Sequence, residues 1–119
     1  MKISGNMSKY NKKISFFEIL SNIPSNNTNW YIFEFDAIGK APNNLTMPEF
    51  EDLVLNSKYG YQMSWDELLK FSKEIEDINN LILVSSTTPV EFDAIETDTE
   101  DLSVRLEIDD STFWELEFY

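Results

Sequence analysis

Apolar positions recur along the chain with two spacings, one typical of helices and one typical of strands. Helical spacing occurs in three segments, and each segment opens with a capping-box pattern, a Ser or Thr followed three residues later by Glu. The three pairs are Ser15 with Glu18, Thr46 with Glu49, and Ser64 with Glu67. We therefore predict three helices. The first ends before Pro24 and the second ends near Lys58.

Each predicted helix has one apolar face that we expect to be buried. The second helix has Pro48 in its first turn, where the missing N–H costs nothing, and we expect it to bury Phe50, Leu53 and Val54. The third helix has the most regular pattern. Its inward positions are Trp65, Leu68, Phe71, Ser72, Ile75 and Ile78.

Three further segments, before the end of the chain, have the pattern of strands. Residues 30–37 carry aromatic and β-branched side chains on both faces, which predicts a strand inside the sheet. Residues 81–85 form a short continuous apolar run, typical of a strand buried on both faces. Residues 89–95 alternate apolar and acidic side chains after Pro89, which predicts a strand that starts at Pro89 or lies at an edge.

The end of the chain predicts a hairpin with a defined register. Leu102, Val104, Leu106 and Ile108 alternate on one strand, and Thr112, Trp114, Leu116 and Phe118 alternate on the other. Placing both apolar sets on one side favours pairs whose residue numbers sum to 220, such as Leu106 with Trp114. The hairpin then turns at residues 109–111, and Arg105 lies opposite Glu115 on the solvent face.

These elements predict an α+β fold with about three helices packed on one face of a mostly antiparallel sheet of four to five strands ending in a C-terminal hairpin. Residues 1–13 are polar, basic and unpatterned, so we expect a loose basic N-terminal arm. Residues 14–119 contain no repeat or linker and are predicted to form a single α+β domain.

Composition argues against most kinds of enzyme. Cysteine and histidine are absent, which removes disulfides, thiolate nucleophiles, the usual general base and the commonest metal ligand. The three glycines are far apart, so no glycine-rich phosphate loop exists. Paired carboxylates are the remaining catalytic chemistry that composition allows. We expect no enzymatic activity, no cofactor and no metal.

The hydrophobic segments are short. None approaches the roughly 18 residues needed to span a bilayer, and the polar N-terminus lacks the apolar core of a signal peptide. We therefore expect a cytoplasmic protein that does not act at a membrane.

Net charge is the strongest indication of function. The chain carries a charge of −13, and its distribution is uneven, with a net +2 over residues 1–40, −5 over residues 41–79 and −10 over residues 80–119. Such a field repels nucleic acid and anionic lipid and attracts basic proteins. The alternative is an acidic surface that only keeps the protein soluble.

The acidic residues near the end of the chain are our candidate partner-binding surface, since the predicted strands and loops leave them facing solvent. The alternative is a solubilising edge that blocks strand addition. The candidate residues are Asp93, Glu96, Asp98, Glu100, Asp101, Glu107, Asp109 and Asp110.

Part of this cluster imitates a calcium-binding loop. Glu96, Asp98 and Glu100 alternate like the oxygen ligands of such a loop, and Glu107 follows at a suitable distance. Asp101, however, stands where the loop needs glycine, and a strand rather than a helix follows. We therefore favour a solvated acidic loop over a calcium site.

Residues 60–75 (GYQMSWDELLKFSKEI), preceded by the aromatic strand NWYIFEFDA, resemble small immunity proteins of bacterial polymorphic toxin systems. The nearest type is the contact-dependent growth inhibition immunity protein. The resemblance covers the overall character of most of the chain and this one helix opening. It implies a cytosolic, non-catalytic protein that blocks a cognate toxin domain, often a basic nuclease, by covering its active site or substrate surface. It assigns no role to individual residues.

Electrostatics points to the same kind of partner. A nuclease toxin must present Lys and Arg to phosphate, so an acidic inhibitor gains both association rate and specificity. Two alternatives stay open, namely an acidic nucleic-acid mimic that inhibits a restriction enzyme or similar DNA-binding enzyme, and a non-enzymatic acidic accessory domain, with or without bound calcium.

Overall fold

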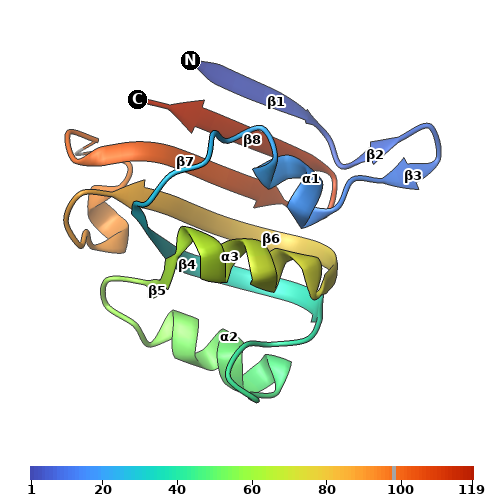
Figure 1. The fold of residues 1–119 in the computed structure, drawn as a ribbon, viewed down its shortest axis with the longest axis horizontal. Coiled ribbons are helices and arrows are strands. Elements are labelled where there is room, and N and C mark those ends of the chain that lie inside the picture. Colours follow the sequence, from blue (N-terminus) through green and yellow to red (C-terminus); the bar gives the residue numbers. More distant parts are fainter. Residues whose placement is uncertain (98) are drawn as a thin grey trace.

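The computed structural model describes residues 1–97 and 99–119. Within these residues, six strands form an antiparallel sheet, two short strands form a separate ribbon, and three α-helices and one 3₁₀ helix complete the fold (Figure 1). The strands are β1 (Lys2–Asn6), β2 (Ser8–Lys9), β3 (Lys12–Lys13), β4 (Asn29–Gly39), β5 (Tyr61–Ser64), β6 (Ile75–Ser86), β7 (Leu102–Asp109) and β8 (Phe113–Phe118). The helices are α1 (Phe16–Leu20), α2 (Met47–Leu55), α3 (Trp65–Lys73) and the 3₁₀ helix η1 (Phe92–Ala94).

The sheet order is β1-β8-β7-β6-β4-β5, and all its pairings are antiparallel. The predicted α+β class with three helices and a C-terminal hairpin is confirmed, but the described sheet has six strands where four to five were expected. The two strands that the sequence pattern did not reveal, β1 and β5, are the edges of the sheet. None of the described helices is long and apolar enough to cross a membrane.

The predicted capping boxes set the helix starts. Thr46 and Glu49 exchange both capping hydrogen bonds at α2, and Ser64 and Glu67 do the same at α3. At α1 the Ser15 hydroxyl accepts from the Glu18 N–H, which is one half of the predicted box. The third helix ends at Lys73, so the last two of its predicted inward residues belong to β6 instead, where both are buried.

Gly39 lies where β4 passes the end of α3. At this glycine, β4 passes so close to the junction of α3 and β6 that a Cβ atom would lie 2.5 Å from the Glu74 carbonyl oxygen. The φ angle of 147° lies in the region that only glycine adopts readily. The next residue, Lys40, donates its N–H to the same oxygen over 3.0 Å, which satisfies the end of the helix.

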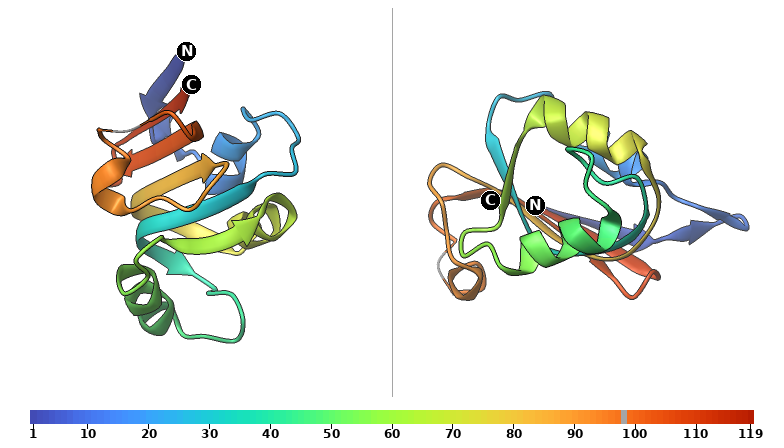
Figure 2. Two further views of the ribbon diagram at one scale, coloured as in Figure 1. Left: turned by 90° about the vertical axis from the view of Figure 1, so that its left-hand side faces the viewer. Right: turned by 90° about the horizontal axis from the view of Figure 1, so that it is seen from below.

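Figure 2 shows α1 and α3 over one face of the sheet. The larger hydrophobic core lies on this face. Its centre is an aromatic cluster in which the rings of Phe35, Phe50 and Phe71 lie 5.3 to 5.4 Å apart. Helix α2 contributes Phe50 and lies along β4, where the Glu51 carboxylate accepts the Ala37 N–H over 3.2 Å. Because β5 pairs with residues 29–32 only, α2 covers the rest of this strand edge.

A smaller core lies on the opposite face, which we call the second face. It contains Tyr31, Phe33, Ile82, Val84, Ile95 and Leu102. The chain between β6 and β7 covers it, and Ile95 from this connection is completely buried. The prediction of a strand over residues 89–95 is therefore wrong. Turn hydrogen bonds such as Ala94 N–H to Glu91 O satisfy the backbone locally. Val90 and Ile95 pack against the sheet, whereas Phe92 remains 46% exposed.

The prediction of a loose arm over residues 1–13 is also wrong where β1 lies. This strand pairs with β8, placing Ile3 beside Leu116 and Gly5 beside Trp114. A Cβ on Gly5 would lie 3.0 Å from the indole nitrogen of Trp114, so the glycine makes room for the ring. Residues Ile3, Gly5 and Met7 alternate toward the core, but the glycine hides this pattern in the sequence.

The hairpin has the predicted faces but a different register. Leu106 pairs with Leu116, so residue numbers sum to 222 rather than 220, and Arg105 lies opposite Glu117 rather than Glu115. The turn decides this register. Asp110 and Ser111 adopt left-handed φ angles of 47° and 61°, and the Ser111 N–H donates to the Asn79 carbonyl oxygen over 2.8 Å. Strand β6 thereby fixes which residues form the turn.

Candidate partner-binding surface

Beyond the β6–β7 connection, the second face is polar and predominantly acidic. We define the acidic sheet face as the carboxylates that β4, β7 and β8 present there, namely Glu34, Asp36, Glu107, Asp109, Glu115 and Glu117. The ladders place Glu34 beside Ile82, Ile82 beside Glu107, and Glu107 beside Glu115 in one row across four strands. Strand order thus gathers acids that are distant in the sequence.

Arg105 ties the acidic sheet face to the β6–β7 connection. Its Nη2 atom lies 2.6 Å from Glu96 Oε1 and 3.1 Å from Glu107 Oε2. The Arg105 side chain is only 14% exposed, whereas that of Glu96 is 63% exposed. The Arg105 guanidinium therefore holds Glu96 and Glu107 together. One cation cannot balance the charge of all the carboxylates on the acidic sheet face.

The two carboxylates bound to Arg105 respond in opposite ways. Burial raises the pKa of Glu107, and the neighbouring Asp109, Glu96 and Glu115 charges raise it further, against the attraction of Arg105. The hydrogen bond from Arg105 lowers the pKa of Glu96, which is close to solvent. The protein itself therefore stabilises the charged form of Glu107 poorly, although Arg105 is bound to it.

The structure places the predicted site residues in two groups. Asp93, Glu96, Glu100 and Asp101 lie in the connection before β7, where Asp101 accepts a hydrogen bond from the Thr88 hydroxyl over 3.2 Å. Glu107, Asp109 and Asp110 lie toward the far end of β7 and in the turn. The two groups meet at Arg105, which joins Glu96 to Glu107. Asp98 lies outside the described residues.

Four members of the acidic sheet face were missing from the sequence-based set. Glu115 and Glu117 alternate with the buried positions of β8, so the hairpin pattern already indicated their outward direction. Glu34 and Asp36 belong to β4, and nothing local indicates that this strand lies one strand away from β7.

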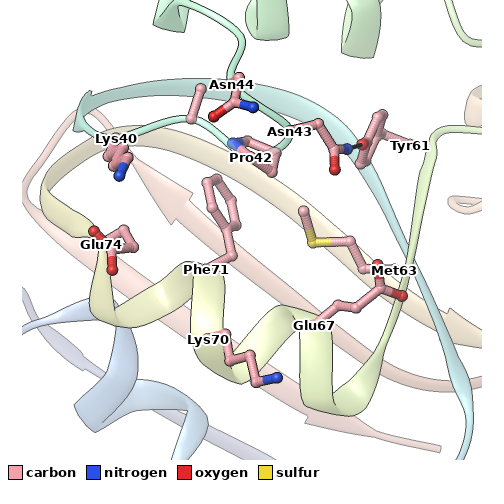
Figure 3. A pocket seen from close by; sticks show the side chains of 11 residues that line it. Lys40, Pro42, Asn43, Asn44, Tyr61, Met63, Glu67, Lys70, Phe71 and Glu74 are labelled. Carbon is pink, nitrogen blue, oxygen red and sulfur yellow. Dashed lines mark hydrogen bonds between the residues drawn. The ribbon is translucent and has the colours of Figure 1, made fainter.

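Figure 3 shows a hollow on another part of the surface, between α3 and the turn that follows β4. Phe71 and Met63 form its floor, and the Asn43 side-chain amide donates to the Tyr61 hydroxyl over 2.7 Å at one side. Its lining includes Lys40, Lys70, Glu67 and Glu74. These charges balance, so the hollow has no net charge that would select an anion or a cation.

In the part of the chain that the structure describes, no group of three or more acidic side chains is arranged to hold a metal ion. The calcium-like pattern includes Asp98, which lies outside the described residues. Comparison of the chain with protein-family models, curated proteins and solved structures gives no match. The fold and the surface together define an α+β domain with an acidic sheet face.

Proposed function

We propose that this chain is a cytoplasmic immunity protein of the bacterial polymorphic-toxin type, close to those of contact-dependent growth inhibition. It binds a cognate basic toxin domain, of the nuclease type, and neutralises it by covering its active site or substrate surface. The observation that carries the proposal is the direct cross-strand pairing of Glu107 with Glu115 on a face that holds six carboxylates.

Like charges directly opposite each other in a sheet oppose folding. A Lys or Arg from a partner, placed between the two carboxylates, converts this repulsion into attraction on binding. The raised pKa of Glu107 supports the same reading, because a carboxylate that its own protein stabilises poorly gains most from an external cation. The net charge of −13 also accelerates encounter with a basic partner.

The proposal is tested by association kinetics with a basic toxin domain encoded next to this chain. We expect the double charge reversal Glu115→Lys with Glu117→Lys to slow association at least tenfold at low salt and to flatten its salt dependence. The matched control, Asp52→Lys with Glu74→Lys, makes the same change in net charge on exposed positions of α2 and at the end of α3. If both double variants slow association equally, only overall charge matters and the acidic sheet face is not the interface.

A nucleic-acid mimic is the second candidate, and one observation favours it. Carboxylates occupy every second position at Glu107 and Asp109 on β7 and at Glu115 and Glu117 on β8, which gives two short lines of regularly spaced negative charge. A mimic would displace DNA from several unrelated DNA-binding enzymes. An immunity protein would protect against one toxin domain only, so competition against a panel of such enzymes separates the two functions.

A further inference from the structure

A groove of about 350 Å³ lies between the end of α2 and η1, beside the acidic sheet face. Phe33 and Val54 form its floor and are 6% and 1% exposed. Leu55 and Phe92 form its walls and are 71% and 46% exposed, which is unusual for large apolar side chains in one hollow. Figure 2 shows α2 and η1 on the same side of the molecule.

The groove is held in shape from both sides. The rings of Phe33 and Phe92 lie 6.0 Å apart, so the wall at η1 rests on the floor. Lys58 follows α2, and Glu91 precedes η1. The Lys58 Nζ atom lies 3.3 Å from Glu91 Oε1, so this ion pair links the two elements. The groove therefore exists before any partner arrives, which lowers the conformational cost of binding.

Glu34 connects the groove to the acidic sheet face. This residue lines the groove and is also the first member of the row that continues through Ile82 to Glu107 and Glu115. Asp93 follows directly after Phe92. Among the described residues that line the groove, none carries a positive charge. An apolar side chain that enters the groove therefore has the Glu34 carboxylate beside it, and the charge of Lys58 next to the groove is already paired with Glu91.

We propose that this groove anchors one large apolar side chain of the partner, flanked in the partner by Lys or Arg residues that lie on the acidic sheet face. The inference rests on the proposed function and adds the anchoring element. Well-packed apolar anchors slow dissociation, whereas exposed charges chiefly set the rate of encounter. The groove and the acidic sheet face thus have separate kinetic roles in one interface.

Three capped hexapeptides serve as probes for the uniformly ¹⁵N-labelled chain. The first is Lys-Lys-Phe-Leu-Lys-Lys, the second replaces Phe-Leu by Ala-Ala, and the third replaces every Lys by Asp. We expect the first peptide to shift the amide signals of Leu55, Ser57 and Phe92, with the other two leaving these signals unchanged. Leu55→Ala should weaken binding of the first peptide at least fivefold.

Leu53→Ala is the matched control. Leu53 lies on the same helix and is 44% exposed, so the prediction that it is buried is wrong, and it does not line the groove. Both leucines are exposed, so neither substitution should change the melting temperature by more than about 2 °C, which is the size expected of a surface change. Unchanged peptide affinity in Leu53→Ala, beside weakened affinity in Leu55→Ala, supports the groove.

Other outcomes overturn the inference. If the Ala-Ala peptide binds as tightly as the Phe-Leu peptide, with shifts confined to β7 and β8, the groove has no anchoring role while the proposed function stands. If the Asp peptide binds equally well, the groove does not select a cationic partner. With the toxin domain, Leu55→Ala should speed dissociation without changing the salt dependence of association. If Leu55→Ala changes neither the association rate nor the dissociation rate, the groove is not in the interface, whatever the charge reversals show.

Discussion

Glu107 and Glu115 lie directly opposite each other in the β7–β8 ladder, although each also has a cation nearby. Arg105 bonds Glu107 but is shared with Glu96, and Lys2 lies 3.7 Å from Glu115 as an exposed pair. In the ion pairs of the described residues, neither cation contacts both Glu107 and Glu115. The repulsion is therefore a property of the folded protein that substitution can measure.

Glu115→Gln should stabilise the protein by about 0.5 kcal/mol at pH 7, because it removes one of two like charges at a cross-strand position. It should also lower the pKa of Glu107 toward its ordinary value of 4.5, since Glu115 is one of the charges that raise it. Urea unfolding measures the stability, and NMR titration of the side-chain carboxyl carbon measures the pKa. An unchanged Glu107 pKa would show that the two side chains turn away from each other.

Glu107 and Glu96, the two partners of Arg105, should make the stability of the protein depend on pH in opposite directions. The folded pKa of Glu107 is raised, so the folded state binds more protons above pH 4.5, and stability falls as pH rises through that raised pKa. The folded pKa of Glu96 is lowered, so its contribution is present above pH 4.5 and is lost as pH falls through the lowered pKa. Urea unfolding of each variant at pH values on both sides of 4.5 tests this. Glu107→Gln should lose the fall in stability with rising pH, and Glu96→Gln should lose the fall in stability with falling pH.

Arg105→Ala should destabilise the protein by about 1 to 2 kcal/mol. It leaves Glu107 without its cation, and because the Glu107 side chain is 34% exposed, the effect is smaller than for a fully buried pair. In a double-mutant cycle, Arg105→Ala with Glu107→Ala should cost less than the sum of the single changes. Lys2→Ala, which removes the exposed pair with Glu115, is the control and should cost less than about 0.5 kcal/mol.

Leu106→Ala should cost about 3 kcal/mol of stability, because Leu106 is completely buried between β6 and β8. Leu53→Ala, at an exposed position, gives the comparison for the same chemical change.

The register of the β7–β8 hairpin makes a separate prediction. Cysteines placed at residues 106 and 116 should crosslink more readily than cysteines at residues 106 and 114, because 106 and 116 are the directly opposed pair.

Gly39→Ala should destabilise by more than about 2 kcal/mol, since the new methyl group would meet backbone atoms of Glu74 and Ile75 that cannot turn aside. In Gly5→Ala the atoms nearest the new methyl group belong to the Trp114 ring, a side chain that can shift, so this change should cost less. Thermal unfolding of both variants tests the order. If Gly39→Ala melts at the wild-type temperature, β4 does not cross the end of α3 as closely as described.

Local chemistry was sufficient to predict the helices, because Thr46, Ser64 and their Glu partners form bonds within a few residues of the chain. The hairpin faces were also predictable, since alternation fixes which side of the sheet each residue occupies. Alternation cannot distinguish a pairing sum of 220 from 222, because both keep the same faces together. That choice depends on Asn79 and the turn at Ser111, which meet only in the folded chain.

The candidate surface shows the same division. The charge gradient along the chain indicated the region that contains Glu96 and Glu107, and the structure joins these two residues through Arg105. The contribution of β4 could not be predicted from the sequence. Glu34 lies in one row with Glu107 and Glu115 only because of the order of the strands in the sheet. The groove depends on Phe92 lying in a 3₁₀ turn, whereas its alternating neighbours had indicated a strand.

The pairing of β1 with β8 has a consequence for how the molecule is made. Their backbones meet at a hydrogen bond from Met1 to the Phe118 carbonyl oxygen, across 117 positions of sequence. Residues 2–6 are synthesised before every other strand, yet they have no partner in the sheet until residues 113–117 exist. Closing so long a loop is slow, so we expect this pairing, which completes the sheet, to form in the last stage of folding. During that wait, the charge of Lys2 and the weak strand propensity of Gly5 make β1 a poor template for pairing with other chains.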